Sequence, residues 1–90
     1  MWQLTLHHKP NVPEEIDSQV EAMLISLQTQ KVTGPNWSVP MELPNGKMQR
    51  VRLFSNQESA QQYADWLLTL EPKDADGTTW HDIIELKQIS

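Results

Sequence analysis

The sequence of 90 residues contains no cysteine, which excludes disulfide bonds, thiolate metal sites and a cysteine nucleophile. It has no run of 18 apolar residues, and its first residues lack the basic and apolar segments of a secretory signal. With three glycines it also has no glycine-rich loop for phosphate. We therefore expect a soluble protein without membrane association, located in a reducing compartment such as the cytoplasm.

Basic residues are scarce, and the formal net charge is −5. DNA and RNA binding depends on clustered lysine and arginine, so we do not expect a nucleic-acid partner. Arg50 and Arg52 are a local exception in an otherwise acidic chain. The length fits one small domain, and there is no internal repeat, so residues 1–90 are predicted to form a single domain.

Apolar residues recur with a period of two in four segments and with helical spacing in two. The predicted order is strand 2–8, helix 13–30, strand 37–43, strand 47–55, helix 56–70 and strand 80–89. The residues Pro44, Asn45 and Gly46 are typical of a hairpin turn. Ser55 and Glu58 suggest a capping box at the start of the second helix.

This β-α-β-β-α-β order matches the split βαβ arrangement known as ferredoxin-like. The predicted fold class is α+β, a two-layer sandwich with two helices on one face of a four-stranded antiparallel sheet of strand order 4-1-3-2. That order places the second strand at an edge of the sheet. Pro40 cannot donate a ladder hydrogen bond, so it favours the same edge position.

The alternation of apolar residues along each strand predicts which side chains lie on each face of the sheet. We expect Leu4, Leu6, Val39, Met41, Val51, Leu53, Ile84 and Leu86 to face the helices. The open face then carries the candidate ligand or interface residues His7, Met48, Arg50, Arg52, Phe54, His81 and Ile83. Exposed apolar residues usually mark an interaction surface. Trp37 and Trp80, near strand starts, are candidate interface anchors.

The three histidines lie where the first and last predicted strands meet. Alternation directs His7 and His81 to the open face, and His8 and Asp82 to the helices. A metal site or an acid/base pair needs convergent side chains, which this division between two faces opposes. We therefore predict no metal, no other cofactor and no catalytic residue.

The architecture resembles the dimeric α+β barrel group of small ferredoxin-like proteins, in which two open sheet faces close against each other. The resemblance covers the whole chain but includes no catalytic motif. Members of that group include binding and regulatory modules, and enzymes that act on small organic molecules in a cavity between sheet and helices. We expect a small non-enzymatic interaction or accessory protein, homodimeric through its open face or bound to another protein. The alternative is a small-molecule binder or enzyme of that group, with His7, His81, Arg50 and Arg52 around a cavity.

Overall fold

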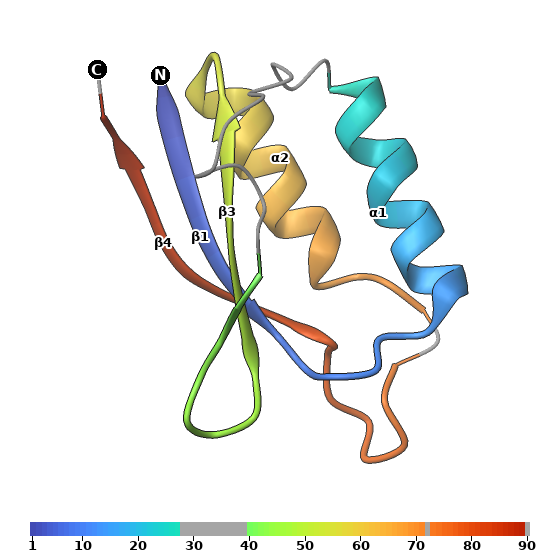
Figure 1. The fold of residues 1–90 in the computed structure, drawn as a ribbon. Coiled ribbons are helices and arrows are strands. Elements are labelled where there is room, and N and C mark those ends of the chain that lie inside the picture. Colours follow the sequence, from blue (N-terminus) through green and yellow to red (C-terminus); the bar gives the residue numbers. More distant parts are fainter. Residues whose placement is uncertain (28–39, 72, 90) are drawn as a thin grey trace.

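The computed structural model describes residues 1–27, 40–71 and 73–89, which form a four-stranded antiparallel sheet with two helices on one face (Figure 1). The elements are β1 (Trp2–His8), α1 (Glu14–Ser26), β2 (Met41–Glu42), β3 (Met48–Phe54), α2 (Gln57–Leu67) and β4 (His81–Gln88). The strand order is β2-β3-β1-β4. The predicted ferredoxin-like sandwich is therefore confirmed, while Trp37 and Val39 of the predicted second strand lie outside the described residues.

The hairpin between β2 and β3 turns at the predicted residues. Gly46 has a φ of +84°, in the left-handed region that favours glycine. The backbone N–H of Leu43 donates to the carbonyl of Lys47 at 2.8 Å and closes the turn. The short β2 lies at one edge of the sheet, as expected for the second strand.

The two helices begin differently. The Asn56 side chain caps α2, because its Oδ1 accepts a hydrogen bond from the Ser59 backbone N–H at 2.8 Å. The predicted capping box of Ser55 and Glu58 is wrong by one residue. Helix α1 follows Pro13 without a side-chain cap, and acidic residues occupy its first turn.

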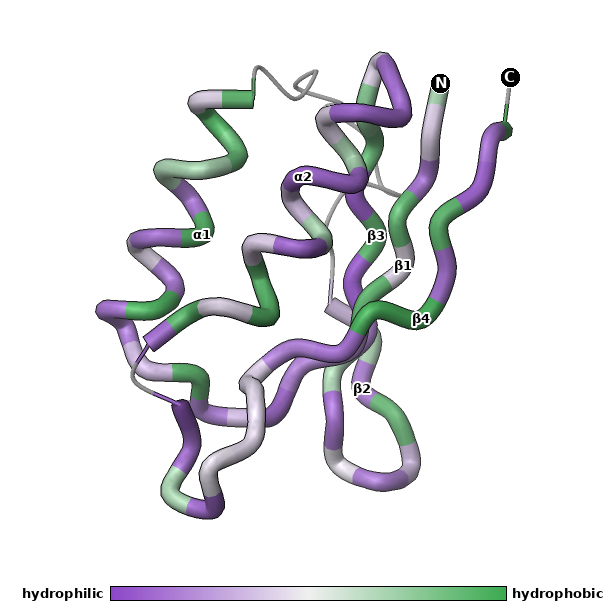
Figure 2. The backbone as a smooth tube through the Cα atoms, turned by 180° about the vertical axis from the view of Figure 1, so that it is seen from behind, coloured by the Kyte–Doolittle hydropathy of each residue, from purple (hydrophilic) through white to green (hydrophobic). Residues whose placement is uncertain are grey.

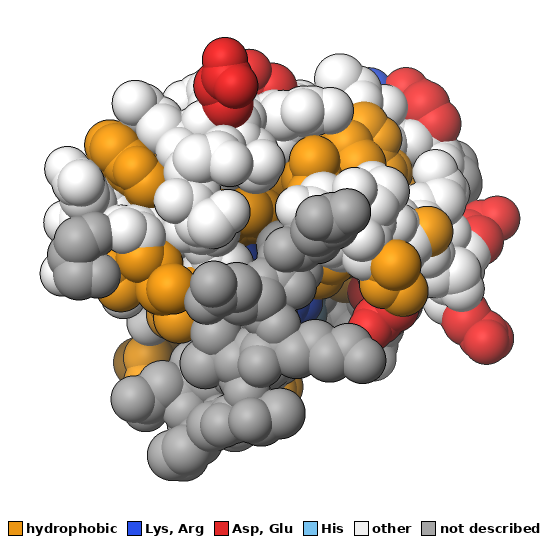
Figure 3. All heavy atoms as spheres, turned by 90° about the horizontal axis from the view of Figure 1, so that it is seen from above, with side chains coloured by type: hydrophobic (Ala, Val, Ile, Leu, Met, Phe, Trp, Pro, Cys, Tyr) orange, Lys and Arg blue, Asp and Glu red, His pale blue; other side chains and the backbone are white. Residues whose placement is uncertain are grey.

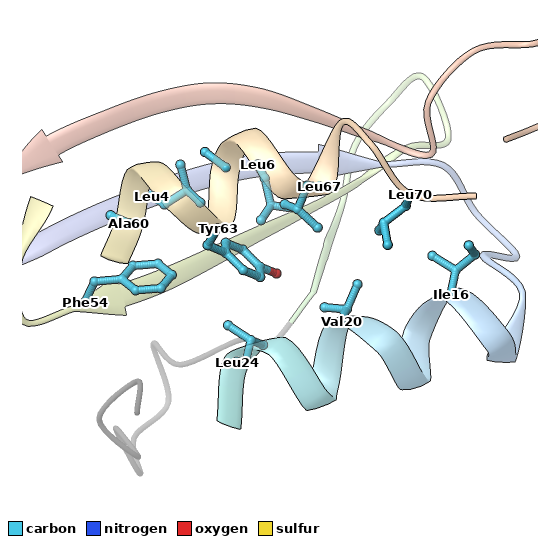
Figure 4. Packing of buried hydrophobic residues seen from close by; sticks show 11 residues of the cluster. Leu4, Leu6, Ile16, Val20, Leu24, Phe54, Ala60, Tyr63, Leu67 and Leu70 are labelled. Carbon is cyan, nitrogen blue, oxygen red and sulfur yellow. The ribbon is translucent and has the colours of Figure 1, made fainter. Parts of the chain in front are cut away.

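The hydrophobic core lies between the sheet, α2 and one side of α1. Its buried residues are Leu4, Leu6, Ile16, Val20, Leu24, Phe54, Ala60, Tyr63, Ala64, Leu67 and Leu70. Figure 4 shows the buried side chains of α1 directed toward those of α2. The rings of Phe54 and Tyr63 lie 5.5 Å apart, centroid to centroid, and join β3 to α2.

The register between β1 and β3 decides which β3 side chains face the helices. Residues paired directly across the two strands are Trp2 with Phe54, Leu4 with Arg52, Leu6 with Arg50, and His8 with Met48. Directly opposed residues share a face, and Leu4 and Leu6 are buried in the core. The predicted open-face position of Met48, Arg50, Arg52 and Phe54 is therefore wrong. Apolar residues occur at both parities of β3 (Figure 2), so alternation alone could not choose the face.

A β-bulge in β4 changes the face of its first residues. Thr5 pairs with Glu85, but Leu6 pairs with Ile83, so Ile84 has no directly paired residue in β1. His81 pairs with His8 and, like Ile83, faces the helices. The predicted open-face position of His81 and Ile83 is wrong because strict alternation was assumed through Ile84.

The open face keeps a mixed character, with different residues from those expected. His7 lies there as predicted, and its Nε2 is 3.0 Å from Oε1 of Gln49. Val51 and Leu53, expected under the helices, pair with Thr5 and Gln3 and so lie on the open face. Met41 pairs with Gln49 and lies there too, 53% exposed.

The loop after α2 returns to β4 beside the end of β1. Nζ of Lys9 lies 2.7 Å from Oδ2 of Asp74 and 3.5 Å from Oδ1 of Asp76. The backbone N–H of Lys9 donates to the carbonyl of Trp80 at 3.0 Å. Lys9 therefore connects the end of β1 to the middle of this loop and to Trp80 at its end.

Candidate functional site

A pocket of about 180 Å³ lies between α1 and the sheet. Among the described elements, the backbone of α1 comes close to α2 but not to the strands. Figure 1 shows α1 standing farther from the sheet than α2. A pocket of this volume suits a small molecule.

Polar residues form most of the pocket lining. The sheet supplies His8, Arg50, Arg52 and His81, and the helices supply Asp17, Glu21 and Tyr63. Leu6 and Val20 add apolar contact. The sheet residues meet because Leu6 pairs with Arg50 on one side of β1 and His8 pairs with His81 on the other. Strand register therefore gathers groups from three separate parts of the sequence.

His8 is held as a neutral ring. Its Nδ1 lies 2.8 Å from the Lys9 carbonyl oxygen, which can only accept, so Nδ1 donates. Its Nε2 is left to accept from Nε of Arg50 at 3.1 Å. Burial lowers the pKa of His8, in agreement with this tautomer. His8 therefore orients the Arg50 guanidinium rather than carrying charge.

His81 is a second neutral ring, only 4% exposed, with its centroid 5.8 Å from that of His8. Burial lowers the pKa of His81 to about 4, and the neighbouring His8 and the two arginines act in the same direction. Nδ1 of His81 is buried and has no hydrogen-bond partner in the described part of the chain. A buried unsatisfied polar atom costs about 1–3 kcal/mol, so its presence beside a pocket indicates a place for a ligand.

Positive charge is concentrated on the sheet side of the pocket. The Arg52 side chain is buried, with the residue 8% exposed. Burial and the positive charge of Arg52 lower the pKa of Arg50, although a guanidinium stays charged in a protein. Burial raises the pKa of Tyr63, and the charge and hydrogen bond of Arg52 oppose that rise, so the phenol is neutral. The sheet wall thus carries two positive charges among neutral polar groups.

Negative charge lies on the helix side. Asp17 and Glu21 are four residues apart, on the same face of α1, and both are exposed. Their carboxylates act electrostatically on Arg50 and favour its charged form. The pocket therefore has a cationic sheet wall and an anionic helix wall.

The structure brings three of the predicted site residues together. Arg50, Arg52 and His81 line the pocket, on the helix side of the sheet. Phe54 belongs to the core beside them. His7 lies on the opposite face, so the predicted grouping of His7 with His81 is wrong.

The other predicted residues lie away from the pocket lining. Met48 and Ile83 share the helix-facing side of the sheet with the pocket residues but do not line it. Trp80 is partly buried at the start of β4, with Nζ of Lys9 6.0 Å from its ring centroid. Trp37 lies outside the described residues, and the interface role proposed for both tryptophans stays a prediction.

Four polar pocket residues were not among the predicted site residues: His8, Asp17, Glu21 and Tyr63. The spacing of Asp17 and Glu21 was the one available signal, because it places two carboxylates on one helix face. The sheet residues that lie opposite Asp17 and Glu21 depend on the register of β3, and the alternation of apolar residues did not determine that register.

Within residues 1–27, 40–71 and 73–89, no group of three or more His, Cys, Asp or Glu side chains is arranged to hold a metal ion. Neither described helix is long and apolar enough to cross a membrane. No protein-family model matches the chain, and no curated protein is significantly similar to it in sequence. The functional conclusion therefore depends on the geometry of the pocket.

Proposed function

We propose that this protein binds a small molecule through a carboxylate or phosphate group, in the pocket between α1 and the sheet. The observation that supports this function is the convergence of Arg50 and Arg52 on one pocket, next to the buried imidazole of His81. Guanidinium groups bind carboxylates and phosphates through paired hydrogen bonds. Burying guanidinium groups beneath a helix costs more free energy than filling the same space with apolar side chains. A charged residue at a position that favours an apolar one is typical of functional sites.

The chemistry favours binding over catalysis. Both ring nitrogens of His8 already have partners, and Tyr63 is a neutral phenol. The arginines can hold an anion but are poor general bases, because they do not lose their protons. We propose a non-enzymatic binding protein, and a cytoplasmic location consistent with the lack of cysteine.

Isothermal titration calorimetry with acetate, propionate, succinate and inorganic phosphate tests this function. We expect at least one of these anions to bind and Arg52→Gln to weaken it tenfold or more, because the buried charge is lost. The matched control is Lys87→Gln, which removes an exposed cation paired with Glu85. Binding that is equally sensitive to both substitutions would contradict the pocket assignment, as would failure of all anions to bind.

Homodimerisation through the open sheet face is a second candidate function. Met41 and Ile84 are exposed large hydrophobic residues, 53% and 51% accessible, and Met41 lies on that face near Val51. Figure 3 shows that hydrophobic side chains reach the surface in several separate patches. A standard interface buries about 800 Å² per partner. This candidate keeps the dimer expected from the sequence but assigns it to different residues.

Sedimentation velocity over a range of protein concentrations tests the dimer. We expect a dimer that Met41→Lys converts to a monomer, because a lysine in an apolar interface loses its hydration. The matched control is Ile25→Lys on α1, where the native side chain is 73% exposed. A monomer at every concentration, or equal effects of both substitutions, would contradict this candidate.

A further inference from the structure

The two walls of the pocket carry opposite charge, and this allows the ligand to be specified further. The cationic wall consists of Arg50 and Arg52 from β3, and the anionic wall consists of Asp17 and Glu21 from α1. The two histidines between them are neutral near pH 7, so they do not alter this pattern. A molecule in the pocket lies between two positive and two negative side chains.

A simple anion fits only one of these walls. Its negative charge would be attracted to the arginines and repelled by Asp17 and Glu21. A simple cation would meet the reverse situation, with two buried or half-buried guanidinium groups against it. A molecule with a positive group at one end and a negative group at the other would be attracted to both walls.

We infer that the ligand is a small zwitterion whose carboxylate faces Arg50 and Arg52 and whose ammonium group faces Asp17 and Glu21. This inference rests on the proposed function of anion binding and narrows its ligand class. The volume of about 180 Å³ limits the ligand to a compact molecule, such as an amino acid with a short carbon chain. Leu6 and Val20 supply apolar contacts for that chain.

The experiment compares molecules of matched length by isothermal titration calorimetry at pH 7. One set is β-alanine, propionate and propylamine, and the other is γ-aminobutyrate, butyrate and butylamine. We expect the amino acid of at least one set to bind tenfold or more tightly than the acid and the amine of the same length. The amino acid that binds more tightly would indicate which separation of ammonium and carboxylate groups matches the distance between the two charged walls.

Substitutions in the anionic wall separate the two ends of the ligand. The double change Asp17→Asn and Glu21→Gln should remove the tenfold preference by weakening the amino acid, while the acid binds as well as before or better. Arg52→Gln should weaken the acid and the amino acid together. Glu14→Gln is the matched control, because this acidic residue is also exposed on α1 but does not line the pocket.

The outcomes distinguish the inference from the function on which it rests. If the acid binds as tightly as its amino acid and Arg52→Gln weakens both, anion binding holds and the zwitterion is wrong. If only the amine binds, or if no member of either set binds, both proposals are wrong. A preference for the amino acid that survives the double change would show that Asp17 and Glu21 do not recognise the ammonium group, and would overturn the inference.

Discussion

The helix-facing side of the sheet has two halves that differ in chemistry although they share strands β1 and β3. Under α2, Leu4, Phe54 and the Tyr63 ring belong to the buried hydrophobic core. Toward the other end of the same strands, His8 and Arg50 line a polar pocket beside α1. Alternation explains why all these side chains lie on one face, but not why one half is apolar and the other charged.

The difference follows the helix that covers each half. Helix α2 comes close to three strands, so side chains beneath it must fill a narrow space without unsatisfied polar groups. Helix α1 comes close only to α2 among the described elements, which leaves room for charged groups and a ligand. The α2 half therefore accounts for stability and the α1 half for the proposed function. Four predictions test this division, from the largest expected effect to the smallest.

Truncating an aromatic residue in the apolar half should cause the largest loss in the free energy of unfolding. Phe54→Ala should lower the free energy of unfolding by about 3–5 kcal/mol, because it removes a buried ring and leaves a cavity. The contrasting change is Arg52→Met, two residues earlier on the same face, where a buried charge gives way to an apolar chain. Its effect should stay within about 1 kcal/mol, and urea unfolding measures both. Comparable losses of unfolding free energy in the two variants would contradict the division between a stabilising half and a binding half.

Lowering the pH should destabilise the protein through the polar half. The unfolded chain binds a proton at His81 near pH 6.5, whereas the folded protein keeps this ring neutral down to about pH 4. Unfolding therefore takes up a proton between these values, and stability falls as the pH is lowered through them. Between pH 7 and 5 the loss attributable to His81 should be about 2 kcal/mol.

The histidine effect is measured by urea unfolding at pH 7, 6 and 5. His81→Leu should reduce the pH dependence clearly, and His8 accounts for part of what is left, because its pKa is lowered too. The matched control is His7→Gln, which removes a histidine at the same end of β1 but on the open face, outside the pocket. A slope unchanged by His81→Leu would show that the buried ring is not the titrating group.

Helix α2 depends on a local cap that α1 lacks. Asn56→Ala should lower the free energy of unfolding by about 1 kcal/mol, because the Ser59 backbone N–H loses its side-chain acceptor. Ser55→Ala, the matched control, should change stability by less than about 0.5 kcal/mol. Equal effects of the two changes would favour the capping box expected from the sequence.

The smallest effect is expected where Lys9 holds the loop before β4. Lys9→Met should speed the hydrogen exchange of the Gly77 amide, which donates to the Asp74 carbonyl at 2.8 Å, while core amides of β1 stay protected. Exposed ion pairs contribute little to global stability, so the unfolding midpoint should hardly move. Lys73→Met, which removes the ion pair to Glu71, is the matched control and should leave Gly77 exchange unchanged.

Element order, strand order and the hairpin could be predicted from the sequence because each depends on local patterns and on few topological choices. The edge position of β2 followed from the predicted strand order, and Pro40 favoured the same position independently. The face assignment of β3 could not be predicted, because Val51 and Leu53 compete with Phe54 and Met48 as core residues. Burying Arg52 in place of Val51 runs against hydrophobic patterning, and the ligand site proposed here explains that exception.

The site was predictable only in part for the same reason. Arg50, Arg52 and His81 were among the candidate residues predicted for the open face, and all three line the pocket on the other face. The predicted sheet face of these residues was wrong. The register of β3 places the two arginines under the helices, and one bulged residue in β4 reverses the parity of His81. Asp17 and Glu21 enter the site through the position of α1 relative to the sheet, which no local pattern specifies.

The bulge at Ile84 also affects how this protein behaves at high concentration. Strand β4 is an outer edge of the sheet, and a long, straight edge strand offers its free backbone groups to a neighbouring molecule. The register shift interrupts that edge between Ile83 and Glu85, and the charged Asp82 and Lys87 lie on either side of it. The same irregularity that directs His81 into the pocket therefore discourages edge-to-edge aggregation. Deleting Ile84 would restore a continuous edge while leaving His81 paired with His8.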